Sequence, residues 1–173
     1  RADGFSNTAY NLNVDLKHVQ AYAQLAETIV SRMDVLKFAG RFERSRKLID
    51  KDMKRLVEKM GRWLLRGPLE RHEYVSYRGI STTVAAHGGD FEEAVGLIIE
   101  AMLQSPRFIY RIEEQHESGG WPVGDFELAS RMSFNVWGAP PDSELMKVAE
   151  SGNLNREKEL QKQLDRILKD PLA

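Results

Sequence analysis

The most apolar stretch of the chain, DFEEAVGLIIEAMLQSPRFIYRIE at residues 90–113, has helical periodicity. At about 100° per residue it forms two neighbouring apolar stripes, Phe91, Val95, Ile98 and Met102 in one and Ala94, Leu97 and Ala101 in the other. A helix that is apolar over so wide an arc is contacted from several sides, so we predict a central helix that begins after Asp90. Gly96 lies inside this helix, where glycine is unfavourable, and predicts that a second helix crosses closely there.

Seven further segments have the periodicity, N-caps and stop signals of helices. They run from Asp15 to about Met33, from Asp50 or Asp52 to about Arg66, from Leu69 to His87, from Ser105 to Glu113, from Asp125 to Val136, from Asp142 to Ala149, and from Asn155 to Lys169. No segment alternates between apolar and polar residues for long enough to predict a strand. The fold class is therefore all-α, an irregular multi-helix bundle of about eight helices with no sheet.

Three stretches of the chain resemble consecutive domains of one family, and this resemblance implies three parts along the chain. Residues 1–49 are expected to be the end of a preceding helical domain plus a connector, 50–116 a central helical domain, and 117–173 the start of a following helical domain. The connector, Asp34 to Ile49, and the loop Ser118 to Gly124 lack a periodic apolar face and are expected to be the most mobile internal segments. Because the chain starts at Arg1 without an initiator Met, we expect it to be a piece of a longer product.

Composition excludes several classes of function. The 173 residues include no cysteine, which excludes disulfides, thiolate metal sites and covalent attachment of c-type haem within this segment. A net charge of −1 gives no general attraction to nucleic acid. No apolar run approaches the roughly 18 residues of a membrane helix, so we expect no membrane span.

The candidate partner-binding residues fall in three places, and none of them predicts a catalytic, cofactor-binding or metal site. They are Arg41, Arg44, Arg46 and Lys47 in the connector, His116 in a Gly-rich loop, and Trp121 and Trp137 at the two ends of the helix 125–136. The connector cations could grip phosphate or an acidic partner, or form a solvated face diluted by neighbouring acids. His116 could touch a metal or a haem edge, or be a solvated loop residue. The tryptophans could stack on a sugar, or pack at a helix junction.

Three arginines lie among apolar residues. Arg107, Arg111 and Arg131 are expected to be buried at helix junctions with carboxylate partners, and Glu127 is placed four residues before Arg131 for such a pair.

Two stretches carry a resemblance to a known family. Residues 66–113, which include RGPLERHEY and SPRFIYRIE, and residues 126–173, which include ELASRMSFNVWGAPPDSELMKVAESGNL, resemble consecutive domains of unknown function in large planctomycete proteins. Residues 3–33 resemble the end of the preceding domain more loosely. Members of that family are exported and multidomain, and often carry c-type haem motifs in other domains. The resemblance thus implies a periplasmic or otherwise extracytoplasmic protein, with no cofactor in this segment, and it supplies no catalytic residues.

Two functions follow as hypotheses. The first is a helical scaffold or interaction segment of a larger cytochrome-c-associated protein, which supports electron transfer by neighbouring domains. The alternative is part of an extracytoplasmic enzyme, acting on polysaccharide at a groove near Trp121 and Trp137. The expected partners are other domains of the same polypeptide or protein subunits. Self-association is also expected, through the apolar face of the last helix, Leu160, Leu164, Ile167 and Leu168.

Overall fold

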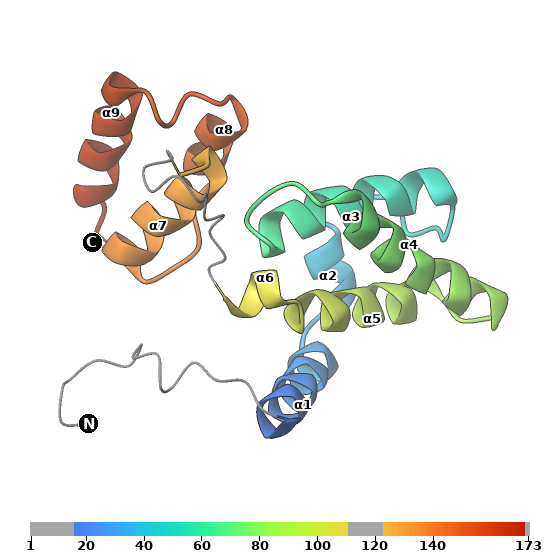
Figure 1. Ribbon diagram of the computed structural model, residues 1–173. Helices are drawn as coiled ribbons and strands as arrows, with labels where there is room; N and C mark the ends of the chain where they lie inside the picture. The colour runs from blue at the N-terminus through green and yellow to red at the C-terminus, as the bar shows by residue number, and fades with distance from the viewer. Residues whose placement is uncertain (1–15, 111–122, 172–173) are drawn as a thin grey trace.

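The computed structural model describes residues 16–110 and 123–171, which form nine α-helices and no strand (Figure 1). The helices are α1 (Leu16–Arg32), α2 (Val35–Ala39), α3 (Asp50–Leu64), α4 (Arg71–Ala86), α5 (Phe91–Leu103), α6 (Pro106–Ile109), α7 (Asp125–Trp137), α8 (Ser143–Glu150) and α9 (Glu157–Leu168). The all-α fold of about eight helices is confirmed, and the additional helix is α2.

The first core forms around α5, which contacts α1, α2, α3, α4 and α6. Asp90 caps this helix, because its side chain accepts a hydrogen bond from the Glu93 N–H at 2.9 Å. The stripe predicted from Phe91 to Met102 is buried and packs on the apolar stripe of α3, Met53, Leu56, Val57, Met60 and Leu64. The second predicted stripe is wrong at Leu97, whose side chain is 41% exposed. No helix among the described residues covers α5 fully on that side.

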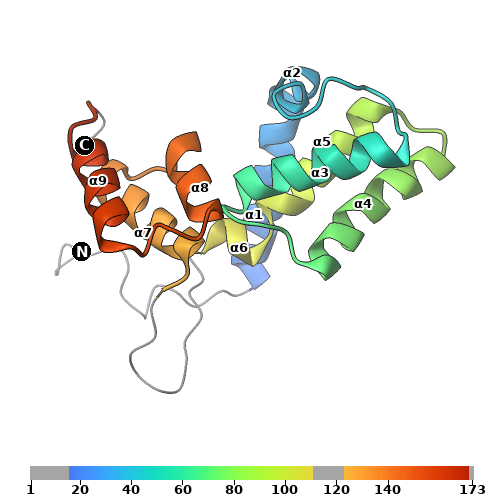
Figure 2. The same cartoon turned by 90° about the horizontal axis from the view of Figure 1, so that it is seen from above.

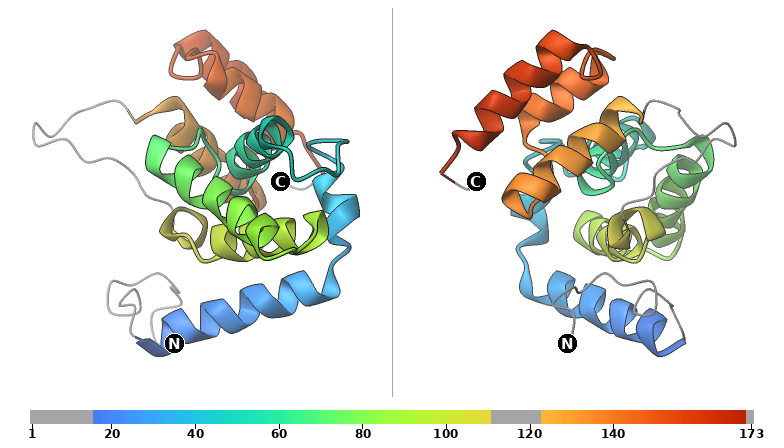
Figure 3. Two further views of the ribbon diagram at one scale, coloured as in Figure 1. Left: turned by 90° about the vertical axis from the view of Figure 1, so that its right-hand side faces the viewer. Right: turned by 60° about the vertical axis from the view of Figure 1, so that its left-hand side comes forward.

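A close crossing at Gly96 is confirmed, and the crossing helix is α1. A Cβ atom placed on Gly96 would lie 3.3 Å from Cγ1 of Val30, which is tighter than ordinary contact. Figure 3 shows α1 as a separate layer along one side of α5. Ala26 is the one buried residue of α1, and Val19 and Ile29 of the predicted face stay exposed.

The predicted connector contains a helix, so its expected lack of an apolar face is wrong. Asp34 caps α2 by accepting from the Lys37 N–H at 2.8 Å, and Val35 and Ala39 are buried in the first core. A helix of five residues is too short to show periodicity in the sequence. Residues of α1 and α2 pack in the same core as α5. The domain boundary expected at residue 49 stays a prediction. Most of the loop expected to be mobile, 118–122, lies outside the described residues.

The second core joins α7, α8 and α9 and is separate from the first (Figure 1). Its buried residues are Ala129, Met132, Leu145, Ala149, Leu154 and Ile167. A polar network ties α8 to α9 beside this core: Arg166 donates to both carboxylate oxygens of Asp142, at 2.7 and 3.0 Å, and to the buried Gln163 at 2.9 Å. The side-chain amide of Gln163 also donates to Glu159 at 2.9 Å, so its polar atoms keep hydrogen-bond partners although the residue is buried.

The last helix differs from the prediction in its start and in its exposed face. Asn155 does not cap α9, which begins at Glu157. Asn155 instead binds the start of α7, donating its N–H to Asp125 at 3.0 Å and its side-chain amide to the Val123 carbonyl at 2.8 Å. Most of the apolar face of α9 packs within its own core, and only Leu168 is strongly exposed. Self-association stays a prediction, and the larger exposed apolar surface is on α1, at Leu16, Val19, Leu25 and Ile29.

The Gly96 crossing predicts a selective effect of side-chain size. Gly96→Leu should lower the free energy of unfolding by about 1–3 kcal/mol, since the added atoms meet Val30. Gly79→Leu is the matched control, because Gly79 also lies inside a helix but has open space around it; it should be neutral or stabilise by up to about 1 kcal/mol. Urea unfolding of both variants measures the difference, and equal stabilities would contradict the crossing.

The Asp142–Arg166 pair predicts a dependence of stability on acid pH. Burial alone would raise the pKa of Asp142, but hydrogen bonds from Arg166 and from the Leu145 N–H hold it below its ordinary value of 3.8. A carboxyl whose folded pKa is lowered stabilises the fold above its unfolded pKa, and this stability is lost as the pH falls through the folded pKa. Asp142→Asn keeps a good N-cap but cannot titrate. Its urea midpoint should fall less than that of the native protein between pH 5 and pH 2, and equal falls would rule out this role of the pair.

Candidate functional site

The two cores meet at Arg66, two residues after the end of α3. Arg66 has a φ of +58°, the left-handed region that L side chains rarely adopt, and its side chain is buried, with 9% exposed. The conformation turns the chain sharply between α3 and Gly67-Pro68, where proline cannot continue the helix. A buried arginine in a left-handed conformation is unfavourable unless its guanidinium is fully engaged.

The Arg66 guanidinium is engaged by two elements, α6 and α7. It donates to the carbonyl oxygens of Phe108 at 3.2 Å, of Tyr110 at 2.8 Å and of Arg107, which are carbonyls at the end of α6. Its Cζ atom also lies 5.7 Å from the ring centroid of Phe134 on α7. Carbonyls at a helix end have no partner within the helix, so a cation there satisfies them. One side chain thus joins α3, α6 and the second core.

A second arginine, Arg107, holds α6 to α4 beside Arg66. Arg107 donates to the Pro68 carbonyl at 3.1 Å and to the carboxylate of Glu73 on α4 at 2.5 Å. Glu73 is buried and also accepts from the Glu70 N–H at 2.9 Å, which closes the capping box of α4. The predicted carboxylate partner of Arg107 is therefore confirmed, whereas the arginine itself is half-buried rather than buried. Arg111 lies outside the described residues, and Arg131 is partly buried on α7, where its pairing with Glu127 stays a prediction.

The polar residues beside Arg107 serve this packing. Burial raises the pKa of the Tyr77 phenol, and its hydrogen bond with Ser105 acts in the opposite direction. The Ser105 hydroxyl also accepts from the Arg107 N–H at 3.3 Å, so it caps α6. The titratable groups here have structural partners, which favours a role in holding α4, α5 and α6 together.

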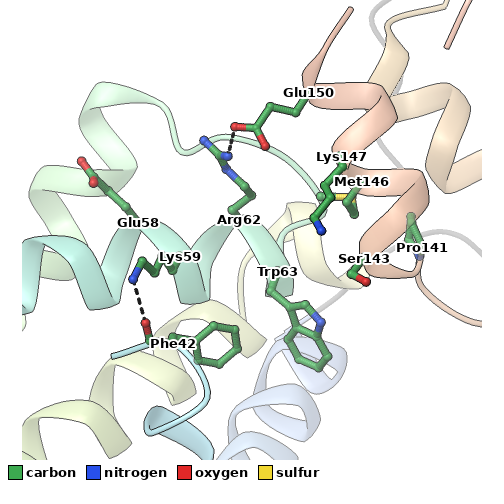
Figure 4. A pocket seen from close by; sticks show the side chains of 10 residues that line it. All are labelled: Phe42, Glu58, Lys59, Arg62, Trp63, Pro141, Ser143, Met146, Lys147 and Glu150. Atoms are coloured by element: carbon green, nitrogen blue, oxygen red, sulfur yellow. Dashed lines mark hydrogen bonds and ion pairs between the residues drawn. The ribbon is translucent and has the colours of Figure 1, made fainter. Parts of the chain in front are cut away.

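The end of α3 lies near α8 (Figure 2), and a groove of about 540 Å³ lies between them (Figure 4). Its apolar residues are Phe42, Trp63, Pro141 and Met146, and its polar ones are Glu58, Lys59, Arg62, Ser143, Lys147 and Glu150. An ion pair between Arg62 and Glu150 spans the two cores at its edge, and Lys59 donates to the Phe42 carbonyl at 3.0 Å (Figure 4). The groove thus has an apolar floor, a charged rim and walls from both cores.

An aromatic cluster with one cation borders the groove. Phe38 and Phe42 make edge-to-face contact at 5.4 Å between ring centroids, and Trp63 lies 5.8 Å from Phe38 and 6.0 Å from Phe42. The guanidinium of Arg41 lies 5.0 Å from the Trp63 centroid and within 5.8 Å of the other two. Trp63 is still 42% exposed. Such a face offers both a large apolar surface and a held cation.

The candidate residues from the sequence are dispersed by the fold. Of the connector cations, Arg41 reaches the groove through the aromatic cluster, whereas Arg44, Arg46 and Lys47 are exposed on the loop that follows. Glu43 within that loop pairs with Arg55 and Lys59, and the hydrogen bond from Arg55 lowers the pKa of Glu43. His116 and Trp121 lie outside the described residues.

Trp137 packs where α7 meets α9. Its Nε1 donates to the Ile167 carbonyl at 3.2 Å, and the Arg166 guanidinium lies 5.9 Å from its ring. This is the packing role that the sequence left open. A polysaccharide groove near Trp121 and Trp137 stays untested.

Sequence reasoning missed Trp63, Met146 and Lys147. The available signal was a tryptophan at the edge of the otherwise aliphatic stripe of α3. The α8 side of the groove gave no signal, because only the tertiary fold brings it opposite α3.

Comparison with protein families divides the chain at the same place as the packing. Residues 52–113 match the family described as PSD5, a protein of unknown function (DUF1595), and residues 123–173 match PSD4, a protein of unknown function (DUF1592). The chain therefore carries two tandem domains of unknown function. No curated protein and no solved structure was found to match it. Arg66 lies in the DUF1595 segment and Phe134 in the DUF1592 segment, so the junction and the groove are formed between the two.

Two further observations concern the described residues. They contain no group of three histidine, aspartate or glutamate side chains placed to hold a metal ion. Their helices also lack the length and apolar character needed to cross a bilayer.

The junction predicts separable roles for the backbone and the guanidinium of Arg66. Arg66→Ala should lower the free energy of unfolding by about 2–3 kcal/mol, since buried carbonyls lose their donors. Arg66→Gly loses the same bonds but relieves the left-handed strain, so it should be more stable than Arg66→Ala by about 1 kcal/mol. Urea unfolding compares the two variants. Native stability in Arg66→Ala would show that the guanidinium does not hold the junction.

Proposed function

We propose that this chain is a helical scaffold that holds two domains, and the parts of a longer protein attached to them, in a fixed arrangement. The observation that carries the proposal is the junction itself. Arg66 binds carbonyls of α6 and the ring of Phe134, and Arg62 pairs with Glu150 across the groove. Relative motion is the default for domains that share a small interface, and the contacts of Arg66 and Arg62 across the two cores oppose it here.

We further propose that the longer protein is exported and associated with c-type cytochrome domains, so that the scaffold supports electron transfer by its neighbours. The support for this step is the resemblance of residues 66–113 and 126–173 to consecutive domains of planctomycete proteins, together with the tandem order of the two family matches. Haem would be held by domains outside this segment, since thioether attachment needs cysteines and this segment has none. Its location would be periplasmic or otherwise extracytoplasmic.

The scaffold role predicts that weakening the junction slows electron transfer without removing haem. The experiment compares the longer gene product with its Arg66→Ala variant, by haem staining, by the Soret spectrum and by stopped-flow reduction of the haem. We expect equal haem content and a slower rate in Arg66→Ala, because the relative positions of the domains become variable. The purified 173-residue chain should give no stoichiometric Soret shift when haem is titrated into it.

Val75→Ala is the control, because Val75 is 58% exposed on α4 and is not among the residues of the junction. A longer product without covalent haem would contradict the cytochrome association. Equal reduction rates in the native protein and in Arg66→Ala would contradict the scaffold role.

A further inference from the structure

Lys147 lines the α3–α8 groove, and Arg41 lies beside the groove over the ring of Trp63. Among the described residues, no ion pair or hydrogen bond joins Arg41 or Lys147 to an acidic side chain. Arg41 is nevertheless held in place, because three aromatic rings lie around its guanidinium. An arginine fixed in this way keeps its planar set of donors free for a bidentate contact with a carboxylate.

The charges around the groove are unequal in sign. Lys59, Arg62, Lys147 and Arg41 are the cations, and Glu58 and Glu150 are the carboxylates. Glu150 is paired with Arg62, and Lys59 lies 3.9 Å from Glu43, which leaves Arg41 and Lys147 against Glu58. The remaining field is therefore positive, although the whole chain has a net charge of −1. A positive patch on a nearly neutral chain is complementary to an acidic ligand.

The floor of the groove fits an apolar side chain. Trp63 presents a ring that is 42% exposed, and Met146 faces the groove from α8 (Figure 4). Methionine adapts to partners of different shape, and tryptophan is among the residues that contribute most to binding at interfaces. A volume of about 540 Å³ is that of a site for a few side chains, rather than for a whole folded surface.

We propose that the α3–α8 groove binds an acidic polypeptide segment, which inserts a large apolar side chain between Trp63 and Met146 and places carboxylates against Arg41 and Lys147. The inference rests on the proposed scaffold role, because both cores must be fixed for the groove to exist. It adds a specific partner chemistry to that role. A segment of this kind lets the scaffold attach a further protein or domain at the line where its two domains meet.

The test uses a random-peptide display library, selected on the purified chain. Enriched peptides are synthesised with a fluorescent label, and their affinities are measured by anisotropy. We expect enrichment of glutamate and aspartate beside tryptophan, phenylalanine or leucine, with binding that weakens as salt is added. Met146→Ala should lower the affinity about tenfold, as for a residue at the centre of an interface. Lys147→Glu should lower it about fivefold, because an exposed attraction becomes a repulsion.

Matched controls lie elsewhere on the same surface. Lys158→Glu reverses an exposed lysine on α9, and Val75→Ala shortens an exposed apolar side chain on α4; both should bind like the native chain. Arg41→Lys keeps the charge but lacks the planar donors, so its affinity for the peptide should lie between that of the native chain and that of Arg41→Gln.

Three results would overturn the inference: no enriched peptide, enriched peptides without an acidic excess, or affinities that Met146→Ala and Lys147→Glu leave unchanged. Loss of a dimer in Lys147→Glu, measured by solution mass, would instead assign the groove to a second copy of the chain and would also overturn it. These variants leave Arg66 intact. Their failure therefore refutes the groove alone, whereas an unchanged electron-transfer rate in Arg66→Ala refutes the scaffold.

Discussion

The structure depends on one buried cation, the guanidinium of Arg66. It satisfies carbonyls at the end of α6 that have no helical partner, and it lies against Phe134 of the second core. The left-handed backbone at this residue is unfavourable by roughly 1–2 kcal/mol, so it persists only because these contacts exceed that cost. The hydrogen bonds of Arg66 lie within the first domain, and its guanidinium over the Phe134 ring reaches the second, as does the Arg62–Glu150 ion pair. Each domain is stabilised separately by its own apolar core.

The groove is a consequence of this junction. Its floor and rim come from α3 and the residues before it on one side and from α8 on the other, so neither domain contains the site alone. The Arg62–Glu150 pair at its edge is exposed and contributes little stability by itself. It joins the α3 wall of the groove to the α8 wall, beside the contacts of Arg66. A surface assembled in this way suits a scaffold, because a partner bound there contacts both domains and depends on their relative position.

The sequence was sufficient for features that depend on local periodicity. The buried stripes of α3 and α5, the Asp90 cap and the crossing at Gly96 all follow from spacing and residue type, and the structure confirms them. The sequence was insufficient for very short helices and for contacts between residues far apart along the chain. The five-residue α2 has too few positions to show a period, and Asn155 binds the start of α7 instead of capping α9. Trp63 and Met146 come together only through the tertiary fold, so no spacing in the sequence joins them.

A junction at Arg66 that fixes the two domains should hold the distance between α4 and α9 constant. Because the chain has no cysteine, Ser76→Cys on α4 and Lys158→Cys on α9 would carry two spin labels at defined places. The distribution of distances between these labels, measured by pulsed electron paramagnetic resonance, tests the claim directly. We expect a single narrow distribution in the doubly labelled protein and a broad one when Arg66→Ala is added. A broad distribution with Arg66 present, or a narrow one that Arg66→Ala leaves unchanged, would contradict it.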